Sequence, residues 1–162
     1  MSDEADASDA PPDPETPHAA PSWQALASGT RAERRHTFTA ADVAAFADLT
    51  GDRNPLHFDE RFARATRFGR LIVHGGLTTG LFNALVAEQL PGPGSVFLHQ
   101  EWDYPVPVGL GDTVVAEVEV LESRADKPIT RLRCVARLAD GTEVLRGESV
   151  VYTARPEADR AP

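Results

Sequence analysis

Three features are scarce in this sequence of 162 residues, and each scarcity excludes a class of protein. The single cysteine, Cys134, allows no intramolecular disulfide and excludes a cysteine-based zinc site. No apolar stretch approaches the roughly 18–20 residues that span a bilayer, so we expect no membrane partner. Positive charge is also scarce: 16 basic against 25 acidic residues leave a net charge of −9, which disfavours binding of nucleic acid.

The remaining composition is that of a globular domain with polar ends. Residues 1–21 contain no aromatic or branched aliphatic side chain, so they cannot bury enough apolar surface to offset the entropy lost on ordering. We expect a disordered acidic tail over 1–21, one domain over 22–155 and a frayed C-terminus over 156–162. The N-terminus has neither the positive region nor the apolar region of a secretory signal, which predicts a cytoplasmic protein.

Two helices are predicted from apolar spacing. A capping-box-like start at Thr39 opens a helix that Gly51 can end in a left-handed conformation. A longer helix is predicted from Leu77 to about Leu90, and its apolar residues cover more than one face, which is typical of a buried helix. Between them, the segment Asp52–His57 is expected to be a loop because Pro55 disfavours a helical conformation before it.

The C-terminal half is predicted to consist of strands. Apolar and polar residues alternate from 112 to 121 and from 130 to 138, which favours half-buried antiparallel strands. Further strands are expected over 95–104 and over 143–152, the latter entered through a hairpin turn at 140–141. The predicted fold class is therefore α+β, with an antiparallel sheet wrapped around a long buried helix.

Three motifs in this order resemble the MaoC-type hot-dog hydratases. They are the block from Phe46 to His57 (FADLTGDRNPLH), the segment 72–75 (IVHG), and the segment 104–108 (YPVPV) followed by Gly-Asp at 111–112. In length, the chain is most similar to the (R)-specific enoyl-CoA hydratases that supply polyhydroxyalkanoate synthesis. The resemblance covers roughly residues 35–153. It implies a hot-dog fold, a homodimer, acyl-CoA substrates, no metal and no redox cofactor.

The resemblance also implies that Asp52 and His57 are the catalytic pair. Hydration of a 2-enoyl thioester needs a base for water, an acid for C2 and donors for the charge on the thioester oxygen. A carboxyl group and an imidazole, with ordinary pKa values of about 3.9 and 6.5, provide a proton acceptor and a group that titrates near neutrality. We expect Asp52 to be the base and His57 the acid, and the reverse assignment is left open.

Other residues receive supporting roles from the same resemblance. The oxyanion donor is expected at Gly75, where helix amides are free, and His74 is expected to hydrogen-bond backbone. Asn54 and Asn83 are expected to support the pair, Asn83 standing where relatives often carry a hydroxyl that orients the aspartate. Gly76 replaces a frequent Met and should leave more room beside the acyl chain or loosen the start of the helix.

A run of arginines at a spacing of three follows the catalytic block. Arg61, Arg64 and Arg67, with Arg70 next in the run, would share one face of a short helix that Asp59 caps and that extends through Arg67, and could bind the phosphates of CoA. For any single arginine a solvated surface position is the commoner explanation. Cys134 lies on the apolar phase of its strand, which predicts a core residue.

Three functions are compatible with these residues. The first is a homodimeric hydratase that adds water to trans-2-enoyl-CoA to give (R)-3-hydroxyacyl-CoA. The second is a hot-dog thioesterase, which would direct water to C1, and the third is a non-catalytic subunit of a hetero-oligomeric dehydratase. The sequence leaves open the acyl chain length and whether the thioester is carried by CoA or by a carrier protein.

Overall fold

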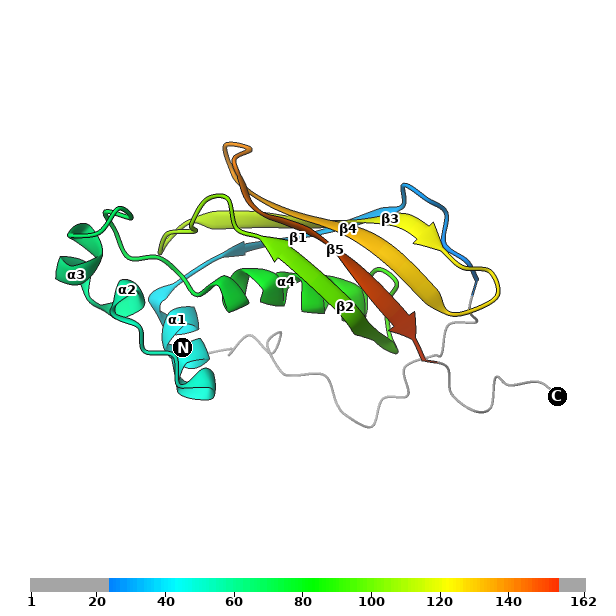
Figure 1. The fold of residues 1–162 in the computed structure, drawn as a ribbon, viewed down its shortest axis with the longest axis horizontal. Coiled ribbons are helices and arrows are strands. Elements are labelled where there is room, and N and C mark those ends of the chain that lie inside the picture. Colours follow the sequence, from blue (N-terminus) through cyan, green and yellow to red (C-terminus); the bar gives the residue numbers. More distant parts are fainter. Residues whose placement is uncertain (1–23, 155–162) are drawn as a thin grey trace, which may run out of the picture.

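Five strands and four helices make up residues 24–154, the part of the chain that the computed structural model describes (Figure 1). The predicted tail over 1–21 and the predicted frayed end over 156–162 lie outside these residues. In chain order the elements are β1 (Arg31–Thr37), α1 (Ala40–Thr50), α2 (Pro55–Phe58), α3 (Glu60–Arg64), α4 (Gly75–Glu88), β2 (Ser95–Asp103), β3 (Thr113–Ser123), β4 (Ile129–Leu138) and β5 (Glu143–Thr153).

The strands form one antiparallel sheet in the order β1-β3-β4-β5-β2, and α4 lies along one face of it (Figure 1). Every second residue of β3 from Val114 to Val120 is fully buried and packs with apolar residues of α4 such as Phe82 and Leu85. At the far edge, the ring of Phe82 stacks on Trp102 of β2 at 5.1 Å. The predicted α+β class, with a sheet around a buried helix, is confirmed.

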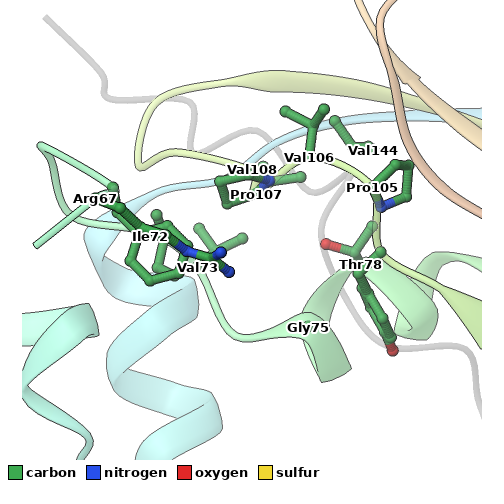
Figure 2. Close-up of a pocket in the computed structure, with 12 residues that line it drawn as sticks. Arg67, Ile72, Val73, Gly75, Thr78, Pro105, Val106, Pro107, Val108 and Val144 are labelled. Carbon is green, nitrogen blue, oxygen red and sulfur yellow. The ribbon is translucent and has the colours of Figure 1, made fainter.

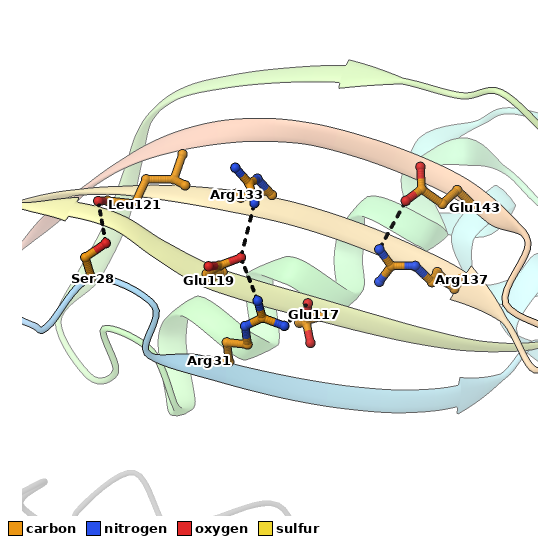
Figure 3. A network of polar contacts seen from close by, with 8 residues as sticks. All are labelled: Ser28, Arg31, Glu117, Glu119, Leu121, Arg133, Arg137 and Glu143. Atoms are coloured by element: carbon orange, nitrogen blue, oxygen red, sulfur yellow. Dashed lines mark hydrogen bonds and ion pairs between the residues drawn. The ribbon is translucent and has the colours of Figure 1, made fainter.

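The sequence patterns did not predict β1, whose residues RAERRHT show no apolar alternation. This strand is paired residue by residue with β3, and cross-strand ion pairs line the solvent face of the sheet (Figure 3). Arg31 lies 3.3 Å from Glu119, which also lies 3.3 Å from Arg133 of β4. Exposed pairs of this kind contribute at most about 1 kcal/mol each, so backbone pairing with β3 is the main reason why a charged segment forms a strand.

The first helix has the predicted cap. Thr39 accepts a hydrogen bond from the backbone of Asp42, and Asp42 accepts one from the backbone N–H of Thr39 at 2.7 Å. This backbone hydrogen bond, together with contacts to the Thr39 hydroxyl and to His36, lowers the pKa of the Asp42 carboxyl. Gly51 ends α1 with a φ of 80°, in the left-handed region that favours glycine.

Three helix boundaries differ from the predictions. Pro55 begins a short helix within the expected loop, because proline suits the first helical position and the Asn54 side chain accepts from the backbone N–H of Leu56. Asp59 caps α3 as expected, but α3 ends at Arg64 instead of Arg67. The helix α4 starts at Gly75, two residues before the first apolar side chain that could reveal it.

Candidate active site

The structure brings Asp52, His57 and His74 together where α1, α2 and α4 meet. Gly51 turns the chain at the end of α1 and leads directly to Asp52, α2 carries His57, and His74 is the N-cap residue of α4. One carboxylate oxygen of Asp52 and one ring nitrogen of each histidine lie within 4.8 Å of one another. The two residues predicted to be the catalytic pair are therefore neighbours.

The orientation of His57 follows from a single hydrogen bond. Its Nδ1 lies 2.8 Å from the carbonyl oxygen of Ile72, and a carbonyl can only accept, so Nδ1 carries the hydrogen. In the neutral ring Nε2 therefore keeps its lone pair, and in the protonated ring it carries the exchangeable proton. His57 is half-buried, so this bond holds the ring while its other nitrogen remains available for proton transfer.

Asp52 is held by its own loop. Its Oδ1 accepts a hydrogen bond from the backbone N–H of Asn54 at 3.1 Å, and its side chain remains 50% exposed. The side chain of Asn54 in turn caps α2, the helix that carries His57. Asn54 thus hydrogen-bonds to the side chain of Asp52 and caps the helix that carries His57, and its supporting role stays a prediction.

An apolar cavity of about 340 Å³ lies beside the first residue of α4 (Figure 2). Figure 2 shows Gly75 at the start of the helix, with the segment 105–108 across the cavity from it. The first amide N–H of a helix has no acceptor within the helix, so the Gly75 amide is a donor at the cavity wall. Apolar side chains that line the cavity include those of Ile72, Val73, Val106, Val108 and Val144.

Tyr104 also lines this cavity, although no role was predicted for it from the sequence. Burial is the main cause that raises the pKa of its hydroxyl, so the phenol stays neutral well above neutral pH. The feature of the sequence that marks this segment is the alternation of proline with apolar residues at 104–108. A local motif of this kind does not show that the segment crosses over the start of α4.

Asn83 lies elsewhere in the structure. It is exposed on α4, eight residues after Gly75, which corresponds to about 12 Å along the helix axis. Within residues 24–154 no hydrogen bond joins it to Asp52. Its supporting role therefore stays a prediction that the geometry of a single chain does not favour.

The prediction that Arg61, Arg64 and Arg67 share one face of a helix is wrong, because α3 ends at Arg64. Arg64 pairs with Glu60 at 2.9 Å, and Arg70 makes a bidentate pair with Asp112 at 3.0 and 2.7 Å. Arg67 lies over the ring of Phe68 and lines the cavity. Arg61, Arg64 and Arg67 are all exposed, and of these three Arg67 is the one at the cavity.

The extra room expected at Gly76 is not present. A Cβ atom at this position would lie 2.5 Å from Cζ of Phe46, so the ring of Phe46 occupies the space that a larger residue would need. Gly76 permits close packing of α1 against α4. In contrast, the prediction for Cys134 is confirmed: the side chain is fully buried, and burial raises the pKa of its thiol to about 11.

Asp52, His57 and His74 are also the one group in the described part of the chain that could offer three ligands to a metal ion. A tetrahedral zinc ion holds nitrogen and oxygen ligands at about 2.0–2.1 Å, hence about 3.3 Å from one another. The three donor atoms are spread over distances of up to 4.8 Å, and both histidines already donate to backbone carbonyls. The metal-free site expected from the sequence stays a prediction.

Comparisons with known proteins place the chain in a family. A family model described as "MaoC like domain" matches residues 23–138. A relative from Aeromonas caviae, named (R)-specific enoyl-CoA hydratase, is 48% identical over 130 residues, which are 80% of this chain and 97% of the relative. A 3-hydroxybutyryl-CoA dehydratase from Methylorubrum extorquens is 42% identical over 119 residues, which are 74% of this chain and 75% of the relative.

Solved structures agree with these relatives. The A. caviae (R)-hydratase, described as involved in PHA biosynthesis, has a TM-score of 0.77 at 46% identity. The match covers 82% of this chain and 100% of that chain. An (R)-hydratase from Pseudomonas aeruginosa has a TM-score of 0.74 at 35% identity, with 81% of this chain and 84% of that chain covered. The expected hot-dog fold is thereby confirmed, and the chain belongs to the MaoC-like family of hydratases and dehydratases, which are lyases.

Proposed function

We propose that the chain catalyses the reversible hydration of trans-2-enoyl-CoA to (R)-3-hydroxyacyl-CoA. The observation that carries this proposal is the position of Asp52 and His57 next to a free helix amide, at Gly75, and an apolar cavity. The names of two close relatives support the same reaction, since one is an enoyl-CoA hydratase and the other dehydrates 3-hydroxybutyryl-CoA.

The geometry suits a single water molecule held between the pair. Within residues 24–154 Asp52 and His57 make no direct hydrogen bond, and polar atoms separated by up to 4.8 Å can share one bridging water. Asp52 accepts a proton as the water oxygen attacks C3, and His57 gives the proton of Nε2 to C2. After hydration the Asp52 carboxyl is protonated and the His57 ring is neutral, so a proton must pass from Asp52 to His57 through water before the next turnover. Dehydration runs the same transfers in reverse.

The thioester oxygen gains negative charge while C3 is attacked. The Gly75 amide at the start of α4 would donate to this oxygen, and the partial positive charge of the helix N-terminus favours the same charge. The acyl chain would extend into the apolar cavity between α4 and the segment 105–108. Arg67, which is exposed at this cavity, is the candidate for the CoA phosphates among the predicted arginines.

We further propose that the functional unit is a homodimer. The strand β2 is an edge of the sheet, and Val96 and Leu98 on it are 53% and 58% exposed. An open edge with exposed apolar side chains favours pairing with another strand, here β2 of a second copy. The opposite edge, β1, carries charged residues that discourage such pairing. The predictions of a cytoplasmic location and of a cofactor-free reaction remain untested.

Incubation with crotonyl-CoA tests the reaction directly. Hydration removes the absorbance of the conjugated enoyl thioester while the CoA thiol stays capped, and chiral analysis should show the (R)-3-hydroxy product. Release of free thiol instead would show that the protein is a thioesterase. No change in either signal would contradict catalysis and favour a binding subunit.

A further inference from the structure

His74 is a buried histidine that contacts both members of the proposed catalytic pair. Its side chain is 2% exposed, and it is the N-cap residue of α4 without capping the helix through its side chain. Its Nε2 lies 2.9 Å from the backbone carbonyl oxygen of Asp52. Its ring lies 3.7 Å from the ring of His57, with 34° between the two planes. Neither helix capping nor core packing alone accounts for this combination of contacts.

The hydrogen bond to Asp52 determines the form of the His74 ring. Since a carbonyl oxygen can only accept, Nε2 of His74 must carry the hydrogen. Nδ1 is then free to remain unprotonated, and within the described residues this buried atom has no hydrogen-bond partner.

Aromatic rings fix His74 from another direction. The ring of Phe46 lies 4.8 Å from it and occupies the space that a side chain at position 76 would fill. Phe58 approaches edge-on at 6.2 Å. His74 is thus packed among aromatic rings, while a hydrogen bond joins it to Asp52 and a ring face joins it to His57.

We propose that His74 is a positioning residue that sets the separation between Asp52 and His57. Through its Nε2–H it holds the backbone from which the Asp52 carboxylate projects, and through its ring face it supports the imidazole of His57. Two groups that must act on one water need this distance to be constant, and a displacement of about 1 Å can reduce a rate by 10²-fold. The inference rests on the proposed hydration reaction.

Two variants separate the two contacts. His74→Gln keeps an N–H donor that can reach the Asp52 carbonyl but removes the ring, whereas His74→Phe keeps the ring but removes the donor. With crotonyl-CoA as substrate, we expect each variant to lower kcat about 10- to 100-fold and to change KM by less than about threefold. Val118→Ala, a truncation of a fully buried side chain on β3, is the stability control and should lower Tm without this loss of kcat.

A second measurement distinguishes positioning from general damage. His74→Phe, the variant that removes the hydrogen bond to Asp52, is combined with Asp52→Asn, and its effect on kcat is compared with its effect in the wild type. If His74 acts through the pair, the loss in the Asp52→Asn background shrinks to less than about threefold, because groups that act as a unit are non-additive. An equal loss in both backgrounds would overturn the proposal.

The other possible outcomes also test the role of His74. Either variant retaining wild-type kcat would overturn the inference for the contact that it removes, and unfolding of both variants would make His74 a folding residue. Failure of the wild-type protein to hydrate crotonyl-CoA would instead reject the proposed function. The wild-type assay therefore keeps the two failures distinguishable.

Discussion

The ring of Tyr104 lies directly over Gly75, so that a Cβ atom at position 75 would stand 3.0 Å from Cε1 of the tyrosine. Tyr104 and Gly75 line the same cavity, so the ring stands beside the proposed oxyanion donor. Any residue other than glycine at position 75 must displace the tyrosine ring slightly. Alanine and proline both do so, and they can therefore be compared for the effect of the N–H alone.

Gly75→Ala and Gly75→Pro both add the Cβ atom, but the proline also removes the N–H. Proline is tolerated at the first helical position, and the ψ of 136° at His74 is one that a residue before proline adopts readily. We expect the proline variant to fold and to have a kcat about 10²- to 10³-fold below that of the alanine variant, as for the loss of an oxyanion donor. Equal rates for the two variants would contradict the role of the Gly75 amide.

Asp52→Asn and His57→Gln each keep a polar side chain and remove the ability to exchange a proton at the reacting atoms. Each should lower kcat about 10²- to 10⁴-fold, with little change in KM, because neither group is needed to hold CoA. The double variant should be barely worse than the worse single variant. A folded single variant that keeps more than about a tenth of the wild-type kcat would reject the pair, since this is a barrier change below ~1.4 kcal/mol.

The homodimer is tested on the open edge of the sheet. Leu98→Lys places a charge on the exposed apolar part of β2 and should convert the dimer to a monomer of 17.5 kDa, measured by light scattering at micromolar concentration. Leu49→Lys is the matched control, because Leu49 is 85% exposed but lies on α1. A wild-type protein that is already monomeric would refute the interface.

The Cys134 thiol should report on unfolding. Because it is fully buried and its pKa is raised to about 11, a thiol reagent at pH 8 should leave the folded protein unlabelled. In denaturant one equivalent should react, since the chain has one cysteine. Rapid labelling of the native protein would show that β4 opens readily around this residue.

The capping box of α1 should lose strength in acid. The folded-state pKa of Asp42 is lowered from 3.8, chiefly by the hydrogen bond from the Thr39 backbone, so the ionised carboxylate stabilises the fold. This contribution is fully present above pH 3.8 and disappears as the pH falls through the lower folded-state pKa. Urea unfolding of wild type and Asp42→Asn should therefore differ at pH 7 and converge in acid.

Thr39→Ala provides the comparison for this experiment. It removes the hydroxyl that the Asp42 backbone uses and should cost about 1 kcal/mol. Much of this cost should remain in acid, because the hydroxyl does not titrate there. A constant difference between wild type and Asp42→Asn down to acid pH would contradict the electrostatic role of the cap.

Local sequence patterns predicted those elements whose side chains carry a periodic signal. The alternation in β3 and β4 and the cap at Thr39 depend on neighbours in the chain, and they agree with the structure. The strand β1 was missed because its register is provided by β3, more than 70 residues later in the chain. The start of α4 was missed because two glycines carry no apolar signal.

For the candidate site, the candidate groups could be named from the sequence: an aspartate and a histidine five residues apart, a glycine before a buried helix, and a family resemblance in three motifs. Their surroundings depend on the packing of the folded chain. The ring of His74 under His57, the ring of Phe46 in the space beside Gly76, and Tyr104 over Gly75 join segments far apart in the chain. Such contacts depend on how elements pack, and no local spacing encodes that packing.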